Sequence, residues 1–298
     1  MTFIRSLKET WAIKFIYSNL ACIIWFGLYF TIAWQIAGGG LNGFIIVAVI
    51  YGVSMTIALS PLGEIILQIL QGCREPATEQ EINYLLPIFE EVYEDAKEMN
   101  PSLNKKIKIY VMDEMYVNAF AMGRKTVIVT RGAMETLTAD ELKGLIAHEF
   151  GHMNYGHTKA LLLTLIGNFF FSVIVWVLRL ILRILLIICS IVANFNFLGI
   201  GFGILTFIVK IIVEVATFVF VQVGDIILAM NSRETETQAD TFAYDIGYGK
   251  ELTSCMYLLQ KISMGAKLKL SERIKASHPH LAYRIQHLEK LESEGYEV

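Results

Sequence analysis

The stretch Ala147-His148-Glu149-Phe150-Gly151-His152-Met153 places two histidines four residues apart. On an α-helix this spacing stacks both imidazoles on one face, where their nitrogens can bind one Zn²⁺. The carboxylate between them can reach a water molecule beside such a metal. A capping-box pattern at Thr138-Ala139-Asp140-Glu141 favours a helix through this stretch. The stretch therefore predicts the zinc helix of a hydrolase. Chance occurrence of a short motif is the alternative, and a third ligand would decide between them.

A candidate for the third ligand lies in the polar segment that follows Met230. Glu236 and Asp240 are four residues apart there. Two histidines and one glutamate, with a fourth position open to water, are the ligand set of a catalytic zinc site. Asp240 suits a place behind the ligands, where it can accept the second N–H of a metal-binding histidine. By spacing alone, however, a salt-bridged helix face is the commoner explanation of these carboxylates, and Glu234 competes as a ligand.

The composition is typical of a membrane protein. Of 298 residues, 55% are apolar and 18% are charged, and the mean hydropathy is +0.52, which is high for a soluble protein. The net charge of −3 gives no indication of a nucleic-acid partner. Four cysteines without a CxxC pair argue against a disulfide framework or a cysteine zinc site. The first apolar run is too long for a cleavable signal peptide, so none is expected.

Two apolar segments predict membrane hairpins. In residues 1–71, a basic arm precedes two spans, expected at about 16–37 and 44–66 and separated by a glycine-rich turn. Residues 159–228 form the second expected hairpin, which turns somewhere within 189–203. Two long helices explain this second segment better than four short spans.

The remaining segments, 72–158 and 229–298, are polar enough to form one soluble domain. The first contains alternating apolar residues at 107–111 and 126–130, which are typical of strands, and it leads into the zinc helix. An even number of membrane crossings must separate the two segments if Glu236 is to reach the histidines. With a basic arm at the N-terminus, this parity places the zinc helix and both termini in the cytoplasm.

The segment His148-Glu149-Phe150-Gly151-His152, followed after a hairpin by Arg233, Glu236, Ala239 and Asp240, resembles the HtpX-like membrane metalloproteases, which are relatives of the CAAX prenyl protease. The resemblance covers nearly the whole chain. It implies a mainly α integral membrane protein, with four transmembrane helices and a cytoplasmic α+β zincin-like metallopeptidase domain that contains a small sheet. It also implies one Zn²⁺ per chain, with His148, His152 and Glu236 as the ligands and Glu149 as the catalytic base.

Two shorter elements extend the resemblance. The segment Asn118-Ala119-Phe120 is similar to the edge strand with which the family holds the backbone of its substrate. The segment Ser277-His278-Pro279 is similar to the family's C-terminal His-Pro element. His278 is therefore the first candidate for donating a hydrogen bond to the oxyanion, and Arg233 is the second. The alternative interpretation of His278 is an exposed histidine of the tail.

The function that the resemblance implies is zinc-dependent cleavage of misfolded or specific membrane proteins at the cytoplasmic face of the plasma or inner membrane. The expected partners are the lipid bilayer and membrane-protein or peptide substrates, and no nucleic acid. One alternative is a protease that processes a single lipidated or peptide substrate. Another is a catalytically inactive membrane scaffold, and the intact set of His148, Glu149, His152 and Glu236 argues against it.

Overall fold

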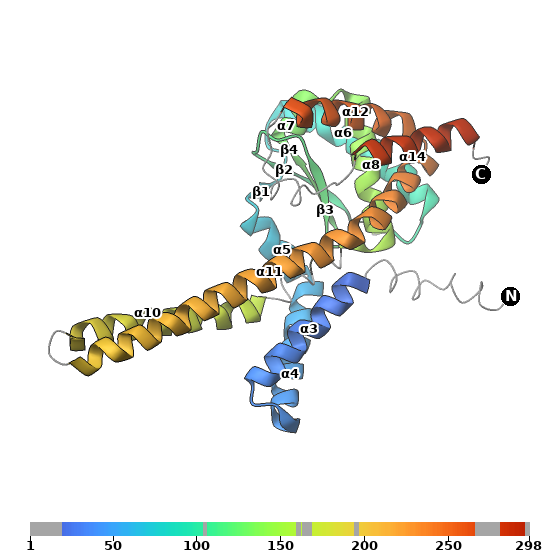
Figure 1. Cartoon of the computed structure of the whole chain (residues 1–298). Coiled ribbons are helices and arrows are strands. Elements are labelled where there is room, and N and C mark those ends of the chain that lie inside the picture. Colours follow the sequence, from blue (N-terminus) through green and yellow to red (C-terminus); the bar gives the residue numbers. More distant parts are fainter. Residues whose placement is uncertain are drawn as a thin grey trace.

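Two helical hairpins project from an α+β head, which contains the sheet and the helices packed on it (Figure 1). The computed structural model describes residues 20–103, 106–158, 162, 169–193, 197–265 and 281–295. The side chains of residues 20–22, 25, 169–175, 197–198, 219–233 and 263–265 lie outside this description. The expected fold class, a mostly helical membrane protein with a small sheet, is confirmed.

The sheet of the head has four strands in the order β1-β2-β4-β3. The strands are β1, Cys73–Arg74; β2, Lys108–Met112; β3, Ala119–Met122; and β4, Thr126–Thr130. Strands β2 and β4 are parallel, with Ile109 opposite Val127, whereas β3 is antiparallel to β4, with Ala121 opposite Val127. Strand β3 therefore lies at an edge of the sheet, and within the described residues its outer side faces no other strand.

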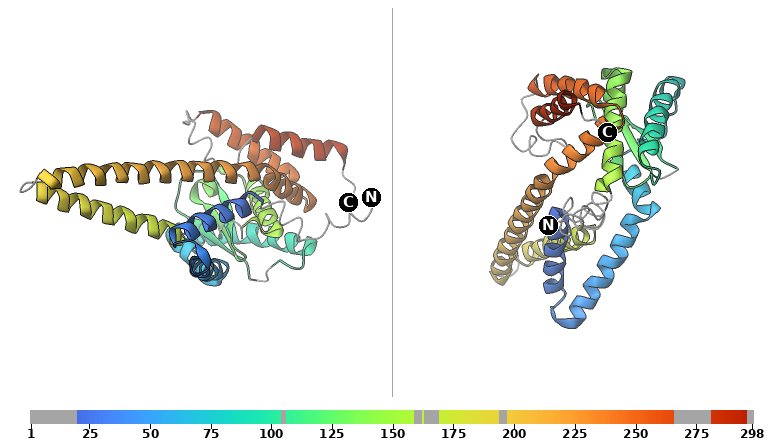
Figure 2. Two further views of the ribbon diagram at one scale, coloured as in Figure 1. Left: turned by 60° about the horizontal axis from the view of Figure 1, so that its bottom comes forward. Right: turned by 90° about the vertical axis from the view of Figure 1, so that its right-hand side faces the viewer.

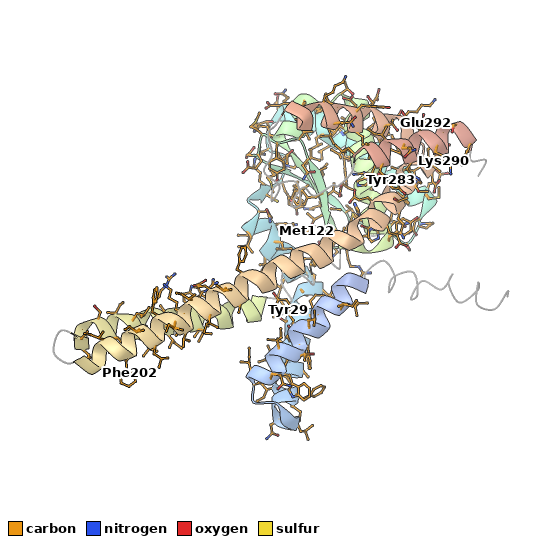
Figure 3. All side chains as sticks on the ribbon, in the orientation of Figure 1. Tyr29, Met122, Phe202, Tyr283, Lys290 and Glu292 are labelled. Atoms are coloured by element: carbon orange, nitrogen blue, oxygen red, sulfur yellow. The ribbon has the colours of Figure 1, made fainter. Side chains whose placement is uncertain are left out.

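Apolar side chains on both faces of the sheet are buried, because strand residues alternate between the faces. Val127 and Val129 belong to the main core, which helices α6, Glu79–Met99, and α8, Ala139–Tyr155, complete on one face. Ile128 and Met122 point to the other face, where they pack in a second cluster with Ala58 and Leu67. Met122 accordingly lies where the head meets the first hairpin (Figure 3). The sheet is thus built partly against helices of the membrane segment.

Three more helices belong to the head. They are α7, Arg131–Thr136, which packs on β4; α12, Gly249–Gly265; and α14, Leu281–Glu294. Helix α12 packs on α8 at Gly144, where an added Cβ would lie 2.4 Å from the backbone nitrogen of Leu252. Helix α14 packs on α12 and buries Ile285 and Leu288 in the main core.

The first hairpin consists of α3, Leu20–Ile36, and α4, Gly40–Leu59. Its turn contains three successive glycines, Gly38, Gly39 and Gly40, with φ values of 93°, 64° and 60°, which side-chain-bearing residues rarely adopt. The span expected at 44–66 ends earlier, because the helix breaks at Ser60. The Ser60 hydroxyl caps a new helix, α5, Pro61–Leu70, which begins with a proline that has no N–H to continue α4.

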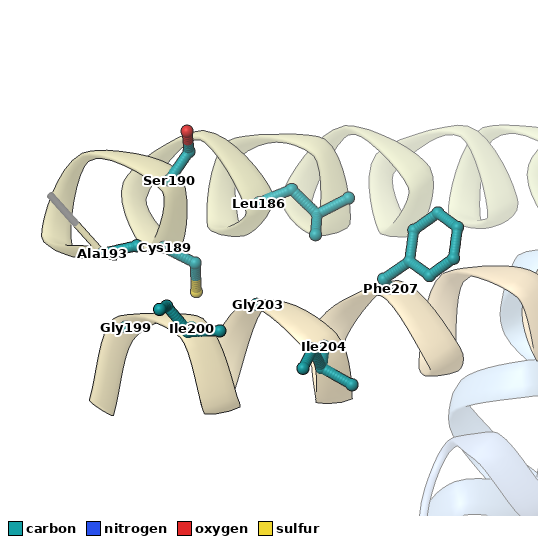
Figure 4. Close-up of a pocket in the computed structure, with 9 residues that line it drawn as sticks. All are labelled: Leu186, Cys189, Ser190, Ala193, Gly199, Ile200, Gly203, Ile204 and Phe207. Atoms are coloured by element: carbon teal, nitrogen blue, oxygen red, sulfur yellow. The ribbon is translucent and has the colours of Figure 1, made fainter. Parts of the chain in front are cut away.

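The second hairpin is formed by α10, Phe169–Ala193, and α11, Phe197–Asp245. With 49 residues, α11 is roughly 70 Å long and runs without a break from the tip of the hairpin into the head (Figure 2). Near the tip, Gly199 and Gly203 allow close approach of α10 around Cys189 (Figure 4). Arg179 and Glu214 form an ion pair between the two helices, with a distance of 2.7 Å.

Within the described residues, three helical stretches are long and apolar enough to cross a bilayer, namely Gly40–Leu59, Trp176–Ala193 and Gly199–Phe218. The fourth expected span, at 16–37, is described only from Leu20 onward, as α3. The two apolar hairpins therefore flank the first part of the head in the sequence, and the second part follows the second hairpin.

Helices α8 and α11 cross in direct backbone contact at Gly151. A Cβ added there would lie 2.7 Å from Cα and 2.8 Å from the carbonyl oxygen of Ala239. We expect Gly151→Ala to destabilise the protein by about 1–3 kcal/mol, because the methyl group must push α11 away from α8. Thermal unfolding in detergent measures the effect.

The control is Gly52→Ala, the same change in α4, where no atom lies within 4 Å of the added Cβ. Equal unfolding midpoints for the two variants would contradict this account of the helix crossing.

Candidate metal centre

Helix α8 presents His148 and His152 at its buried end. The helix begins at a capping box, in which Thr138 and Glu141 exchange hydrogen bonds between side chain and backbone, and this fixes the start of the helix. It ends at Gly156, which adopts a left-handed conformation with φ 76°. The four-residue spacing brings the Nε2 atoms of His148 and His152 to 3.1 Å from each other.

Glu236 of α11 completes a group of three possible metal ligands. Its Oε2 lies 3.4 Å from Nε2 of His148, and its Oε1 lies 3.4 Å from Nε2 of His152. Two donors bound tetrahedrally at zinc distances are about 3.3 Å apart, so these separations fit one ion. All three ligand atoms lie within 4.8 Å of one another. The structure thus brings together the three residues expected from the sequence as metal ligands.

Asp240 and Arg284 contact the group of possible ligands, His148, His152 and Glu236, which is called the metal group below. Asp240 is fully buried, and its Oδ1 lies 2.9 Å from Nδ1 of His148. This contact orients the imidazole so that Nε2 faces Glu236. Arg284 of α14 donates to Asp240 Oδ2 through Nε at 2.8 Å, and its Nη1 lies 2.7 Å from Glu236 Oε2. One guanidinium therefore holds two carboxylates of α11 in place.

The charges around the group favour a divalent cation. Glu149, Glu236 and Asp240 are buried acidic side chains, and Arg284 is the buried guanidinium beside them, so three acids share one permanent cation. Burial and the Arg284 guanidinium lower the pKa of His148, but Asp240 and Glu236 outweigh both effects and raise it to about 9. The donor types, their spacing and the excess negative charge all fit Zn²⁺.

Glu149 lies on the same helix and reaches the edge strand. Its Oε2 accepts a hydrogen bond from the backbone N–H of Ala121 at 2.7 Å. Its Oε1 is buried and has no hydrogen-bond partner within the described residues. A buried carboxylate oxygen without a partner can accept a proton from a small molecule that enters the site.

Strand β3 offers its backbone to the side of the metal group. Asn118 bonds to β4, because its carbonyl oxygen accepts from the N–H of Thr130 at 3.1 Å. Alternation along an antiparallel strand then turns the backbone groups of Ala119 and Ala121 outward, and the contact of Ala121 with Glu149 agrees with this. In the expected segment Asn118-Ala119-Phe120, Ala119 is the residue whose backbone groups point away from β4, where no other strand lies within the described residues.

Arg284 and His157 were missed by the sequence interpretation as neighbours of the ligands. Arg284 is a cation within the apolar stripe of α14, where Leu281, Ile285 and Leu288 recur at helical spacing, and this is the signal that could have revealed a buried partner. His157 lies five residues after His152 in the sequence, and its Nδ1 is 3.0 Å from Nδ1 of that histidine.

His157 also contacts Gln238, whose Oε1 lies 3.2 Å from Nε2 of the imidazole. Burial, followed by the proximity of His152, lowers the pKa of His157 to about 3, so the ring is neutral. A neutral ring that donates to Gln238 through Nε2 accepts at Nδ1, and His152 then donates from its own Nδ1. This arrangement leaves Nε2 of His152 free to bind a metal.

Of the three other candidates from the sequence analysis, Glu234 is the one whose side chain is described. Glu234, the competing carboxylate, is exposed, and Gln238 contacts it at 3.5 Å. Arg233 belongs to α11, but its side chain lies outside the described residues. His278 lies outside them altogether.

Comparisons with known proteins agree with these observations. The model of peptidase family M48 matches residues 83–292, which include all three ligand candidates. A protease HtpX homolog of Dictyoglomus turgidum is 36% identical over 155 residues, which are 50% of this chain and 46% of that protein. The chain thus spans about half the length of this relative. Protease HtpX of Aliivibrio fischeri is 26% identical over 313 residues, covering 93% of this chain and 98% of that protein.

Among solved structures, the crystal structure of S. mikatae Ste24p aligns with a TM-score of 0.44 and 20% sequence identity. The alignment covers 96% of this chain and 65% of that chain.

The geometry predicts that Glu236, and not Glu234, is the third ligand. We expect Glu236→Ala to lose bound zinc or to bind it far more weakly, because only two of three protein ligands remain. Glu234→Ala serves as the matched control, since this carboxylate is exposed and two residues away. Metal analysis of both purified variants measures the difference. Zinc loss from the Glu234 variant alone would contradict the assignment.

Proposed function

Because the chain belongs to peptidase family M48, we propose that it is a membrane-embedded, zinc-dependent endopeptidase. The convergence of His148, His152 and Glu236 on one point, with Glu149 beside them, is the observation that carries the proposal. Two histidines and one glutamate leave a position open for water, as catalytic zinc sites do. When bound, Zn²⁺ polarises a carbonyl group as a Lewis acid and lowers the pKa of water to about 7.

Glu149 acts as the general base in this proposal. Its free Oε1 takes a proton from the attacking water, whose oxygen adds to the carbonyl carbon of the scissile peptide. The protonated carboxyl group then gives this proton to the leaving amine as the C–N bond breaks. The bond from Ala121 N–H to Oε2 keeps the carboxylate oriented while Oε1 exchanges the proton.

Asp240 supports the ligands without binding the metal. Its contact with Nδ1 of His148 fixes the ring, and its contacts with Arg284 fix the carboxylate itself. Loss of such a partner typically costs 10–100-fold in metal affinity or activity. Arg284 cannot serve as a free oxyanion donor, because Asp240 and Glu236 already hold it. His278 and Arg233 remain the candidates for that role.

The substrate binds as an additional strand along β3. Its backbone pairs with the outward-facing groups of Ala119 and Ala121, which lie on the side of Glu149. Recognition through backbone groups accepts many sequences, and it requires an extended segment. Misfolded membrane proteins expose such segments, and we propose them as substrates. A protease for one lipidated or peptide substrate and an inactive scaffold are the alternatives.

The metal group faces the cytoplasm in the proposed topology. The basic N-terminal arm and the even number of crossings between His152 and Glu236 support this orientation. We expect a cysteine introduced at Ser293, exposed on α14, to resist a membrane-impermeant maleimide in intact cells. A cysteine at Asn42, exposed near the turn of the first hairpin, should react.

Both variants require a background without native cysteines. Cys255 cannot report sidedness itself, because it is fully buried and burial raises the pKa of its thiol to about 12. Labelling of the Ser293 variant from outside would contradict the topology.

Glu149→Gln should abolish peptide cleavage and retain zinc, because it removes the base and leaves the three proposed ligands. Cleavage of casein and metal content are measured on the same preparation. Glu135→Gln is the matched control, since this carboxylate is exposed on α7. Cleavage by the Glu149 variant at more than a few per cent of the wild-type rate would show that Glu149 is not the base.

A further inference from the structure

Glu64 is a buried carboxylate far from the metal group in sequence. It belongs to α5, the short helix between the first hairpin and the sheet, and is 9% exposed. Its Oε1 accepts from the backbone N–H of Arg124 at 2.8 Å, and its Oε2 accepts from the hydroxyl of Thr126 at 3.2 Å. One turn further along α5, Gln68 donates to the same hydroxyl at 2.8 Å. Both polar side chains of α5 therefore form hydrogen bonds where the turn between β3 and β4 leads into β4.

The turn is shaped to admit this carboxylate. Gly123 has a φ of 63°, and a Cβ added there would lie 2.4 Å from Cδ of Glu64. The carbonyl oxygen of Gly123 accepts a hydrogen bond from the hydroxyl of Thr158, which follows the metal-binding helix α8. The turn is thus held between α5 on one side and the end of α8 on the other.

The charge of Glu64 has no cationic partner within the described residues. A buried carboxylate that is not paired with a cation is costly, and hydrogen bonds to its oxygens reduce that cost. Here the donors are the backbone N–H of Arg124 in the turn and the hydroxyl of Thr126, the first residue of β4. Displacing the turn would leave the carboxylate buried without partners, so Glu64 resists any such displacement.

The position of this turn determines the position of β3. The strand has only four residues, it lies at the edge of the sheet, and Ala121 is two residues from Gly123. Its face with Phe120 and Met122 rests on the cluster that includes Ala58 of α4 and Leu67 of α5. The hydrogen bond from Ala121 to Glu149 then connects this supported strand to the metal-binding helix.

We propose that Glu64 is a positioning residue that anchors the β3–β4 turn to the membrane hairpin and so keeps the outward backbone of β3 aligned with the metal group. The inference rests on the proposed function for its effect on substrate binding. The anchoring itself is a property of the fold and can be measured without activity. Glu64 touches neither the substrate nor the ligands, so it acts through Arg124 and Thr126.

The test compares Glu64→Leu with Glu64→Gln in the full-length protein. Both side chains resemble glutamate in size, but only glutamine keeps an oxygen that can accept from Arg124. We expect the leucine variant to raise KM for a casein-derived peptide roughly tenfold, with unchanged zinc content. Amide hydrogen exchange in residues 118–126 should rise in the same variant. The glutamine variant should stay close to wild type in both measurements.

Several results would overturn the proposal. These are equal KM and exchange in the two variants, or loss of zinc and global unfolding in parallel with the loss of activity. If the leucine variant does not fold, Gln68→Ala replaces it, because this change weakens the hold on Thr126 alone and should raise exchange in the same segment. Wild-type protein that binds zinc but cleaves nothing would contradict the proposed function, while the exchange data would still decide the role of Glu64.

Discussion

The metal group depends on the crossing of two helices at a single glycine. His148 and His152 come from α8, whereas Glu236 comes from α11, and a whole membrane hairpin separates them in sequence. Their ligand atoms meet because Gly151 lets the backbone of α11 approach at Ala239. Interaxial distances of packed helices depend on the side chains at the contact. A glycine there permits the close approach that two histidines and one glutamate need to reach one ion.

Buried charged side chains also fix the relative positions of the crossing helices. Arg284 binds Glu236 and Asp240 from α14, and Asp240 in turn contacts His148. Each member of such a network would be costly if buried alone, so the network favours one arrangement of the three helices. On the other side of the group, His157 and Gln238 hold His152 in the same way. Each proposed histidine ligand is therefore oriented by a partner outside the ligand set.

The local elements were predictable from the sequence, because their signals are local. The spacing of His148 and His152 and the capping box at Thr138 predict the helix that the structure contains. Apolar alternation likewise predicts β4, Thr126–Thr130. The interruption at Ser60 was missed, because an apolar run continues across it and hydropathy alone does not detect a helix break.

The partners of the ligands were less predictable, because they depend on tertiary contacts. Arg284 lies at the far end of the chain, and helical spacing shows that it is on the apolar face but does not show what it meets. His157 lies five residues from His152, and only the left-handed turn at Gly156 brings its ring back to that histidine. Glu64 belongs to an apolar stretch in which a single acid has no partner nearby in sequence. Its partners lie about sixty residues away, in a turn of the sheet.

The two hairpins position different parts of the proposed site, namely Glu236 and strand β3. Helix α11 extends from the second hairpin into the head without a break and carries Glu236, so its orientation sets the position of the proposed third ligand. Helix α4 of the first hairpin and the following helix α5 support β3 through Glu64 and the cluster around Met122. A change in the angle between the hairpins would move β3 relative to the proposed metal ligands. Since both hairpins are apolar, we expect the surrounding bilayer to help keep β3 aligned with the proposed ligands.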